Sequence, residues 1–301
     1  MITLAFVIQT LRISIPYLFA ASGGVLAERA GIVSLTLEGF MLTGAFCATL
    51  GAYYSATAGI DPAMSAWIGV LCGVAAGVVA GGLHAVASIR YRADQIVVGI
   101  AVNLLAVGIT RFFLKLAFDS SSNSPRIPGF AVEEATTLWS PFGNPLVWLG
   151  LLAIPAVAFV VHRTPFGLRV RAAGEHPEAA TTVGVSVAKV RYLAVILSGA
   201  LASLGGVYLA LDQHQFTDQM TAGRGFIALA AVIFGRWDPV RAGIACLLFA
   251  AAETLQIQLQ GMQGIPSQFV QMIPYVLTIV ALVGIVGRAV PPTALGRTSG
   301  V

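Results

Sequence analysis

Charged residues are scarce in this chain of 301 residues: only 10% are Asp, Glu, Lys or Arg, whereas 57% are hydrophobic. Soluble globular domains carry about 25% charged residues. The shortage excludes a sizeable soluble domain and predicts an all-α polytopic membrane protein, because each membrane-spanning helix needs roughly 20 apolar residues. We expect one transmembrane domain over residues 1–301, surrounded by membrane lipid.

The sequence also lacks the motifs of common catalytic and nucleotide-binding sites. It has no glycine-rich loop ending in Lys and Ser or Thr, no HExxH pair and no nucleophile elbow, and its histidines lack metal-ligand spacing. Its three cysteines, Cys47, Cys72 and Cys246, lie far apart in apolar segments, where we interpret them as small core residues. We therefore expect no catalysis and no cofactor, so ATP hydrolysis would require a separate chain.

Hydropathy predicts nine transmembrane or half-spanning helices. Their ranges are 5–26, 32–54, 64–89, 95–118, 145–162, 191–211, 224–236, 240–259 and 269–287. The segment 224–236 is too short to cross a bilayer as a straight helix, so we expect a buried half-span or a re-entrant segment there.

The basic residues set the orientation of these helices. The net charge of +4 does not indicate nucleic acid binding, because the cations are spread over short loops and form no patch. When the loop 164–190 is placed in the cytoplasm, most of the 17 Lys and Arg residues fall on the inner side. This arrangement puts the N-terminus outside and the C-terminus inside.

The loop at 164–190, TPFGLRVRAAGEHPEAATTVGVSVAKV, resembles soluble protein although it lies between apolar segments. Pro177 at a first helical position, followed by Glu178, Ala179 and Ala180 and then by Gly184 as a stop, predicts a short helix. Such a helix has no lipid-facing stripe and no catalytic set, so we interpret it as a docking surface for another protein. An ordinary cytoplasmic loop with one helical turn is the alternative.

A weak internal repeat divides the chain into halves at about 1–118 and 190–288. Gly39 and Phe40 in EGFMLTGAF match Gly225 and Phe226 in RGFIALAAVIFG, and ADQIVVGIAVNLLAVGI resembles PSQFVQMIPYVLTIVALVGI near the C-terminus. The copies run in opposite senses in the predicted topology, which makes them inverted repeats. This architecture favours a substrate path near the membrane midplane, often at broken helices.

Several polar side chains interrupt the apolar segments, where a central charge costs about +2.5 to +3.5 kcal/mol. Our candidates for the substrate path are Glu38, Asn103, Glu253, Gln256 and Gln260. The last three share one helix face through spacings of three and four residues. A carboxylate with amides suits weak binding of hydroxyl groups and heterocyclic nitrogens. Interhelical hydrogen bonds that merely stabilise the bundle are the alternative for each residue.

Three motifs carry a resemblance to a known family. They are AERAGIVSLTLEGFMLTGAF at 27–46, GEHPEAATTVGVSVAKVRYLAVILSGALASLGG at 174–206 and GRGFIALAAVIFGRWDP at 223–239. Over nearly its whole length the chain resembles permease subunits of bacterial ABC importers, in the branched-chain amino acid, ribose and nucleoside permease superfamily. It is most similar to the smaller permease of nucleoside systems, although Ser34 to Thr36 depart from the usual Asn-Ile-Gly.

The resemblance implies several partners and a location. An ABC ATPase subunit would contact Glu178, Ala179, Ala180 and Gly184, and a second, paralogous permease would complete the path. An extracytoplasmic substrate-binding lipoprotein would dock outside, where the loop 119–144 is a landing place or a mere connector. The substrate would be a nucleoside, and the chain would lie in the bacterial cytoplasmic (inner) membrane as a multi-pass protein.

Two alternatives stay open on the sequence. A permease for a simple sugar such as ribose is the alternative within the same class. An ion-coupled secondary transporter, suggested by the inverted repeats and by Glu38 and Glu253, is the alternative from another class.

Overall fold

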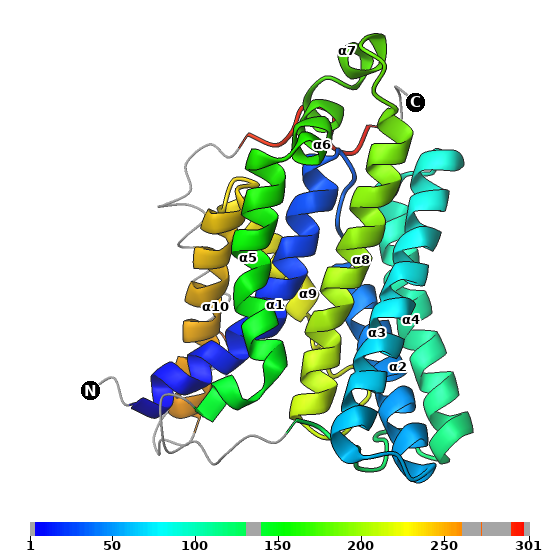
Figure 1. The fold of residues 1–301 in the computed structure, drawn as a ribbon, viewed down its shortest axis with the longest axis vertical. Coiled ribbons are helices and arrows are strands. Elements are labelled where there is room, and N and C mark those ends of the chain that lie inside the picture. Colours follow the sequence, from blue (N-terminus) through cyan, green and yellow to red (C-terminus); the bar gives the residue numbers. More distant parts are fainter. Residues whose placement is uncertain (1–3, 131–139, 261–271, 273–289, 298–301) are drawn as a thin grey trace.

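The computed structural model describes residues 4–130, 140–260, 272 and 290–297, and the structural statements below concern these residues. They form a bundle of long helices with two short helices at one end (Figure 1). The α-helices are α1 (Leu4–Arg29), α2 (Leu37–Thr57), α3 (Pro62–Ala85), α4 (Gln95–Phe118), α5 (Pro145–Arg163), α6 (Pro165–Glu175), α7 (Pro177–Thr182), α8 (Val187–Asp212), α9 (Arg224–Phe234) and α10 (Pro239–Leu259). A π-helical turn over Val86–Arg90 extends α3. The predicted all-α fold is confirmed.

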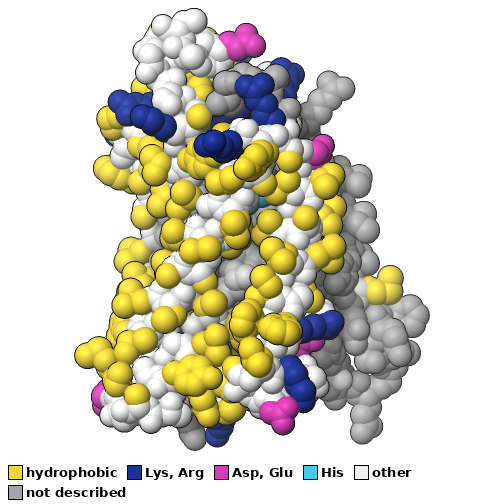
Figure 2. Space-filling view, turned by 90° about the vertical axis from the view of Figure 1, so that its right-hand side faces the viewer, with side chains coloured by type: hydrophobic (Ala, Val, Ile, Leu, Met, Phe, Trp, Pro, Cys, Tyr) yellow, Lys and Arg dark blue, Asp and Glu magenta, His cyan; other side chains and the backbone are white. Residues whose placement is uncertain are grey.

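Six of the described helices are long and apolar enough to cross a membrane: α1, α3 with its π-helical turn, α4, α5, α8 and α10. Figure 2 shows the outer surface of one side, where hydrophobic side chains cover the middle and charged side chains gather toward the two ends. This distribution fits a protein whose middle faces lipid. The N-terminus and the end that carries α6 and α7 lie on opposite sides of that apolar belt (Figure 1).

The second predicted span begins later than expected, at Leu37 and not at residue 32. Residues 30–36 are apolar enough to resemble a helix, but they form a turn and an extended segment inside the bundle. Side chains replace the missing helical hydrogen bonds, because Gln95 Oε1 accepts from Val33 N at 2.8 Å and Glu28 Oε1 accepts from Ser34 N at 3.1 Å. Non-helical backbone at membrane depth is tolerated when protein satisfies its polar groups.

The other predicted spans agree with the described helices to within a few residues. The short segment 224–236 contains α9, whose 11 residues extend about 16 Å. The loop 164–190 contains α6 as well as the expected short helix, because Thr164 caps a helix that begins at Pro165. The predicted span 269–287 and the second copy of the repeat from Pro266 lie outside the described residues.

The centre of the bundle is α8, which packs against α1, α2 and α3. Small residues allow these helices to approach closely: a Cβ atom placed on Gly199 of α8 would lie 2.3 Å from Gly77 O of α3. Small-residue contacts of this kind drive helix association in lipid, where hydrophobic burial gives no driving force. The packed centre provides a rigid frame for the starts of α2 and α9.

Candidate functional site

Helices α2 and α9 both begin inside the bundle, and they run in opposite directions from there (Figure 1). Their starts are joined by Glu38. Its Oε1 accepts hydrogen bonds from Thr221 Oγ1 at 2.6 Å and Gly223 N at 2.8 Å, and its Oε2 accepts one from Gly225 N at 2.7 Å. A carboxylate is favoured there because the N-terminus of a helix carries unpaired N–H groups and a partial positive charge. Glu38, the second residue of α2, thus caps α9.

Gly225 makes this close approach feasible. A Cβ atom at residue 225 would lie 2.4 Å from Glu38 N and 2.8 Å from Glu38 Oε2. Any larger side chain would push the start of α9 away from α2. The repeated Gly-Phe pair noted in the sequence therefore marks the place where the two helix starts meet.

Asn103 on α4 supports the start of α2 from the other side. Its Oδ1 accepts from Gly39 N at 2.8 Å, and its Nδ2 donates to Leu35 O at 2.9 Å. Glu38 and Asn103, both expected on the substrate path, line the same cavity of about 350 Å³. The same cavity is also lined by Gln219, Thr221, Ala222, Gly223 and Phe226.

The segment before α9 is held in an unusual backbone conformation. Gln219 and Ala222 have positive φ angles of 55° and 46°, and Gly223 has 82°. A left-handed non-glycine residue costs on the order of 1–3 kcal/mol and persists only where its surroundings hold it. Glu38 holds this segment on one side, and Arg224 bonds Met220 O at 3.2 Å. Sequence reasoning missed Gln219 and Thr221, although Thr221 and Gly223 before an apolar run are a helix-start signal.

The predicted polar face of α10 is only partly present at this site. Glu253 forms an ion pair with Arg224 at 2.7 Å and accepts a hydrogen bond from Tyr17 Oη. Gln256 is half-buried, Gln260 is exposed just beyond α10, and neither lines the cavity around Glu38. These contacts favour a bundle-stabilising role for Glu253, and they leave the two glutamines apart from Glu38 and Asn103.

We expect Glu253→Ala to reduce the amount of folded protein. The substitution leaves the Arg224 guanidinium inside the bundle without its carboxylate, which should lower the free energy of unfolding by about 3 kcal/mol. Thermal melting in detergent is the measurement, with the double variant Arg224→Met, Glu253→Met as the control. The double variant should recover most of the loss, because it removes both charges together. Equal melting temperatures for Glu253→Ala and the unmodified protein would contradict a stabilising pair.

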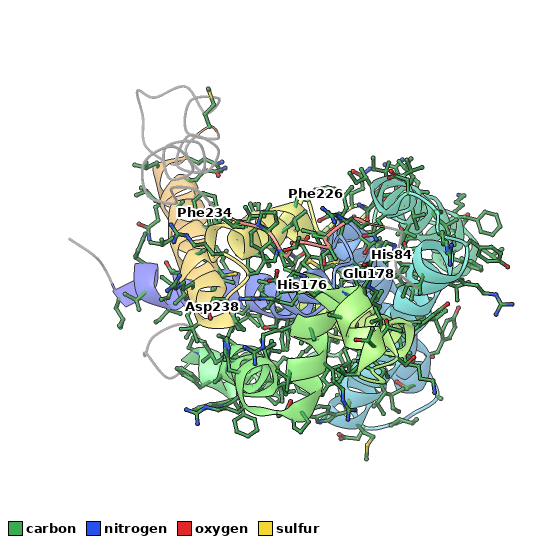
Figure 3. The ribbon with its side chains drawn as sticks, turned by 90° about the horizontal axis from the view of Figure 1, so that it is seen from above. His84, His176, Glu178, Phe226, Phe234 and Asp238 are labelled. Atoms are coloured by element: carbon green, nitrogen blue, oxygen red, sulfur yellow. The ribbon has the colours of Figure 1, made fainter. Side chains whose placement is uncertain are left out.

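The predicted short helix is present as α7, which projects from one end of the bundle (Figure 1). Glu178, Ala179 and Gly184 are exposed, and Gly184, with φ of 81°, lies just beyond the helix as expected. Figure 3, viewed from this end, shows Glu178 among the parts nearest the viewer. Ala180 differs from the others, because it is only 4% exposed and packs inward with Val170 and Val187. It therefore supports the helix from within, while the apolar Val183, 78% exposed, joins the outer surface.

Hydrogen bonds connect this end with the extended segment that leads to Glu38. The buried Arg191 of α8 donates from Nε to Ala30 O at 3.1 Å. The C-terminal segment 290–297 adds two contacts, from Ala294 N to Gly174 O at 2.8 Å and from Gly296 N to Gly31 O at 3.2 Å. A displacement of α6 and α7 would therefore reach residues 30–36 and the start of α2.

The loop 119–130 is hydrogen-bonded to the segment that enters α9. Ser124 N donates to Phe216 O at 2.9 Å, and Asp218 N donates to Ser122 O at 2.8 Å. Arg111 of α4 forms an ion pair with Asp218 at 2.8 Å. The loop thus contacts the chain within a few residues of Gln219 and the cavity.

A bundle of long apolar helices, with the starts of α2 and α9 meeting beside a partly open cavity, is typical of a membrane transport protein. Residues 6–282 match the family model described as the branched-chain amino acid transport system / permease component, and the chain belongs to this family. The family match confirms the resemblance stated from the three sequence motifs.

Named relatives and one solved structure agree with this assignment. The chain is 40% identical to the guanosine ABC transporter permease protein NupQ of Bacillus subtilis, over 95% of this chain and 93% of that protein. It is 37% identical to the nucleoside ABC transporter permease protein NupC of Lactococcus lactis, over 98% and 96%. A metal-chelate type ABC transporter in an inward-facing conformation matches the fold with a TM-score of 0.55 and 16% identity, over 92% of this chain and 85% of that one.

The chain is therefore a non-catalytic permease subunit of a bacterial ABC importer and a multi-pass membrane protein. As such it works with ATPase and binding-protein partners. Family membership sets aside the ion-coupled secondary transporter as an explanation for Glu38 and Glu253.

Proposed function

We propose that this chain forms the path by which nucleosides cross the cytoplasmic membrane. The observation that carries the proposal is the nearly full-length likeness to NupQ and NupC, which are named for guanosine and nucleoside transport. The cavity at Glu38 supports it, because a volume of about 350 Å³ lies within the range of small-molecule sites, roughly 300–1,000 Å³. A permease site with few polar contacts binds weakly, so the solute is released while the binding protein supplies affinity.

The partner surfaces follow from the same proposal. The ATPase subunit docks on Glu178, Ala179 and Gly184 of the α7 region, with Ala180 supporting that helix from within. A second, paralogous permease covers α4. This helix is the least enclosed of the six long helices, because only 17% of the residues in its most apolar stretch are buried. The exposed face of α4 is apolar along Ala101, Leu104, Leu105, Ile109 and Phe112. The substrate-binding lipoprotein docks on the outer side, where loop 119–130 contacts the segment before α9.

Transport in this proposal depends on the two halves of the chain, about 1–118 and 190–288, moving against one another. Closure of the ATPase domains displaces α7 and α6, and contacts at Gly174, Ala30 and Gly31 pass the movement to residues 30–36. Because these residues lead directly into α2, the start of α2 shifts relative to the start of α9. The cavity between the two starts then opens toward the cytoplasm.

Uptake in cells tests the proposal. Labelled guanosine, adenosine and uridine would be supplied to a host that lacks this permease, with and without the restored gene and with excess unlabelled ribose. We expect restored nucleoside uptake that ribose does not reduce. Uptake that ribose suppresses would favour the simple-sugar permease instead, and the absence of nucleoside uptake would contradict the proposed substrate.

A further inference from the structure

Gln219 and Phe226 are the groups of the cavity that remain available to a solute. Glu38 and Asn103 line the same space, but their polar atoms are used within the chain: Glu38 accepts three hydrogen bonds, and Asn103 both accepts and donates one. Glu38 and Asn103 therefore position the two helix starts. Other residues of the cavity therefore contact the solute.

The Gln219 side chain is exposed into this cavity and makes no hydrogen bond within the described part of the chain. A carboxamide offers two donor hydrogens and one acceptor oxygen, the combination that pairs side by side with the edge of a nucleobase. Its backbone is left-handed, with φ of 55°, and the chain two residues later is fixed by the bond from Thr221 to Glu38. The protein thus holds a free amide at the cavity at an energetic cost.

Phe226 supplies an aromatic surface to the same cavity. It lies in the first turn of α9, and 46% of its surface is exposed. Figure 3 shows Phe226 on the side of α9 that faces α2 and α4. An exposed ring beside a free amide matches a flat heterocycle, whose faces stack on aromatic side chains and whose edge carries donors and acceptors.

We infer that Gln219 and Phe226 recognise the nucleobase of the solute, with Phe226 stacking on its face and Gln219 bonding its edge. This inference rests on the proposed nucleoside substrate and adds which part of the nucleoside the permease reads. The sugar then contributes little to selection, because the remaining lining is largely aliphatic, with Leu42, Ile100, Leu104 and Val107. Glu38 is a positioning residue for this pair, since its three hydrogen bonds fix the segment between them.

The test measures maximal uptake rates of guanosine, adenosine and uridine by the complete importer, normalised to permease in the membrane. Maximal rates are used because the binding protein sets the external affinity. Phe226→Ala should lower the rate about tenfold for all three nucleosides, and Phe226→Tyr should retain most of it, because an aromatic face is restored. Phe159→Ala is the matched control: Phe159 is 63% exposed on α5 and does not line the cavity, so its loss should change little.

The variant Gln219→Ala distinguishes a role of Gln219 in nucleobase recognition from a purely structural role. We expect the ratio of guanosine to uridine uptake to change at least threefold, whereas a purely structural defect would lower all rates in proportion. Unchanged rates for Phe226→Ala together with an unchanged ratio for Gln219→Ala would overturn the inference and leave the proposed function standing. Failure of the unmodified importer to take up any nucleoside would overturn the proposed function, and this inference with it.

Discussion

Replacing Glu38 with alanine is expected to lower solute uptake by at least a hundredfold while the permease still reaches the membrane. The change removes three hydrogen bonds, to Thr221 Oγ1, Gly223 N and Gly225 N, from the junction of α2 and α9. Hydrogen bonds to a charged group each contribute about 1.5–3 kcal/mol, and the two backbone N–H groups would lose their partner inside the bundle. The segment 219–223 would lose the contact that keeps its left-handed residues in place.

Uptake of labelled guanosine, corrected for the amount of permease in the membrane, is the measurement for Glu38. Thr221→Val provides the matched control, because it removes one of the three hydrogen bonds and keeps the side-chain shape. We expect it to reduce uptake several-fold, between the unmodified protein and Glu38→Ala. Full uptake by Glu38→Ala would show that the junction does not control the path.

Reversing the charge at Glu178 is expected to abolish transport and the stimulation of ATP hydrolysis by the loaded binding protein. Glu178 is exposed on α7 and its side chain makes no hydrogen bond among the described residues, so the fold should tolerate arginine there. The effect would arise at the contact with the ATPase subunit. Co-purification of the ATPase with the permease, together with uptake, distinguishes lost docking from lost insertion.

Glu178→Gln is the companion variant, because it keeps the length of the side chain and removes only the charge. We expect an intermediate rate and retained co-purification. If Glu178→Arg supports uptake at the unmodified rate with normal accumulation, α7 is not the docking helix. The ordinary cytoplasmic loop considered from the sequence would then be the better interpretation.

Helix positions followed from local signals in the sequence. Hydropathy located the long spans, and Pro177 with Gly184 located α7, because an apolar run and a helix boundary are properties of neighbouring residues. The predicted start of α2 is wrong because it, too, depends on neighbouring residues alone. Residues 30–36 are apolar, and the side chains that keep them extended come from Glu28 and from Gln95, which is distant in the sequence.

The candidate site was harder to predict, because a polar residue does not reveal its partner. The sequence predicts Glu38 and Asn103 on the path, and the structure brings both to one cavity. Their hydrogen bonds, however, hold the starts of α2 and α9. Glu253, Gln256 and Gln260 share a helical spacing, yet an ion pair engages Glu253 and the glutamines lie elsewhere. Gln219 was overlooked because its importance depends on a backbone conformation that the sequence does not specify.

In the proposed function, the solute passes through the cavity between the starts of α2 and α9. The most direct test of this path is chemical access to Ala222, which lines that cavity and is exposed. Ala222→Cys would be introduced after replacement of Cys47, Cys72 and Cys246, and treated in whole cells with a charged thiol reagent that cannot enter lipid. Leu71→Cys, at a residue 69% exposed on α3 outside the cavity, serves as the control.

We predict that residue 222 reacts during transport, that the reaction stops uptake, and that residue 71 stays unreactive. Protection of residue 222 by excess guanosine would accompany this result. If residue 222 stays unreactive in an importer that continues to transport, the solute path lies elsewhere in the protein.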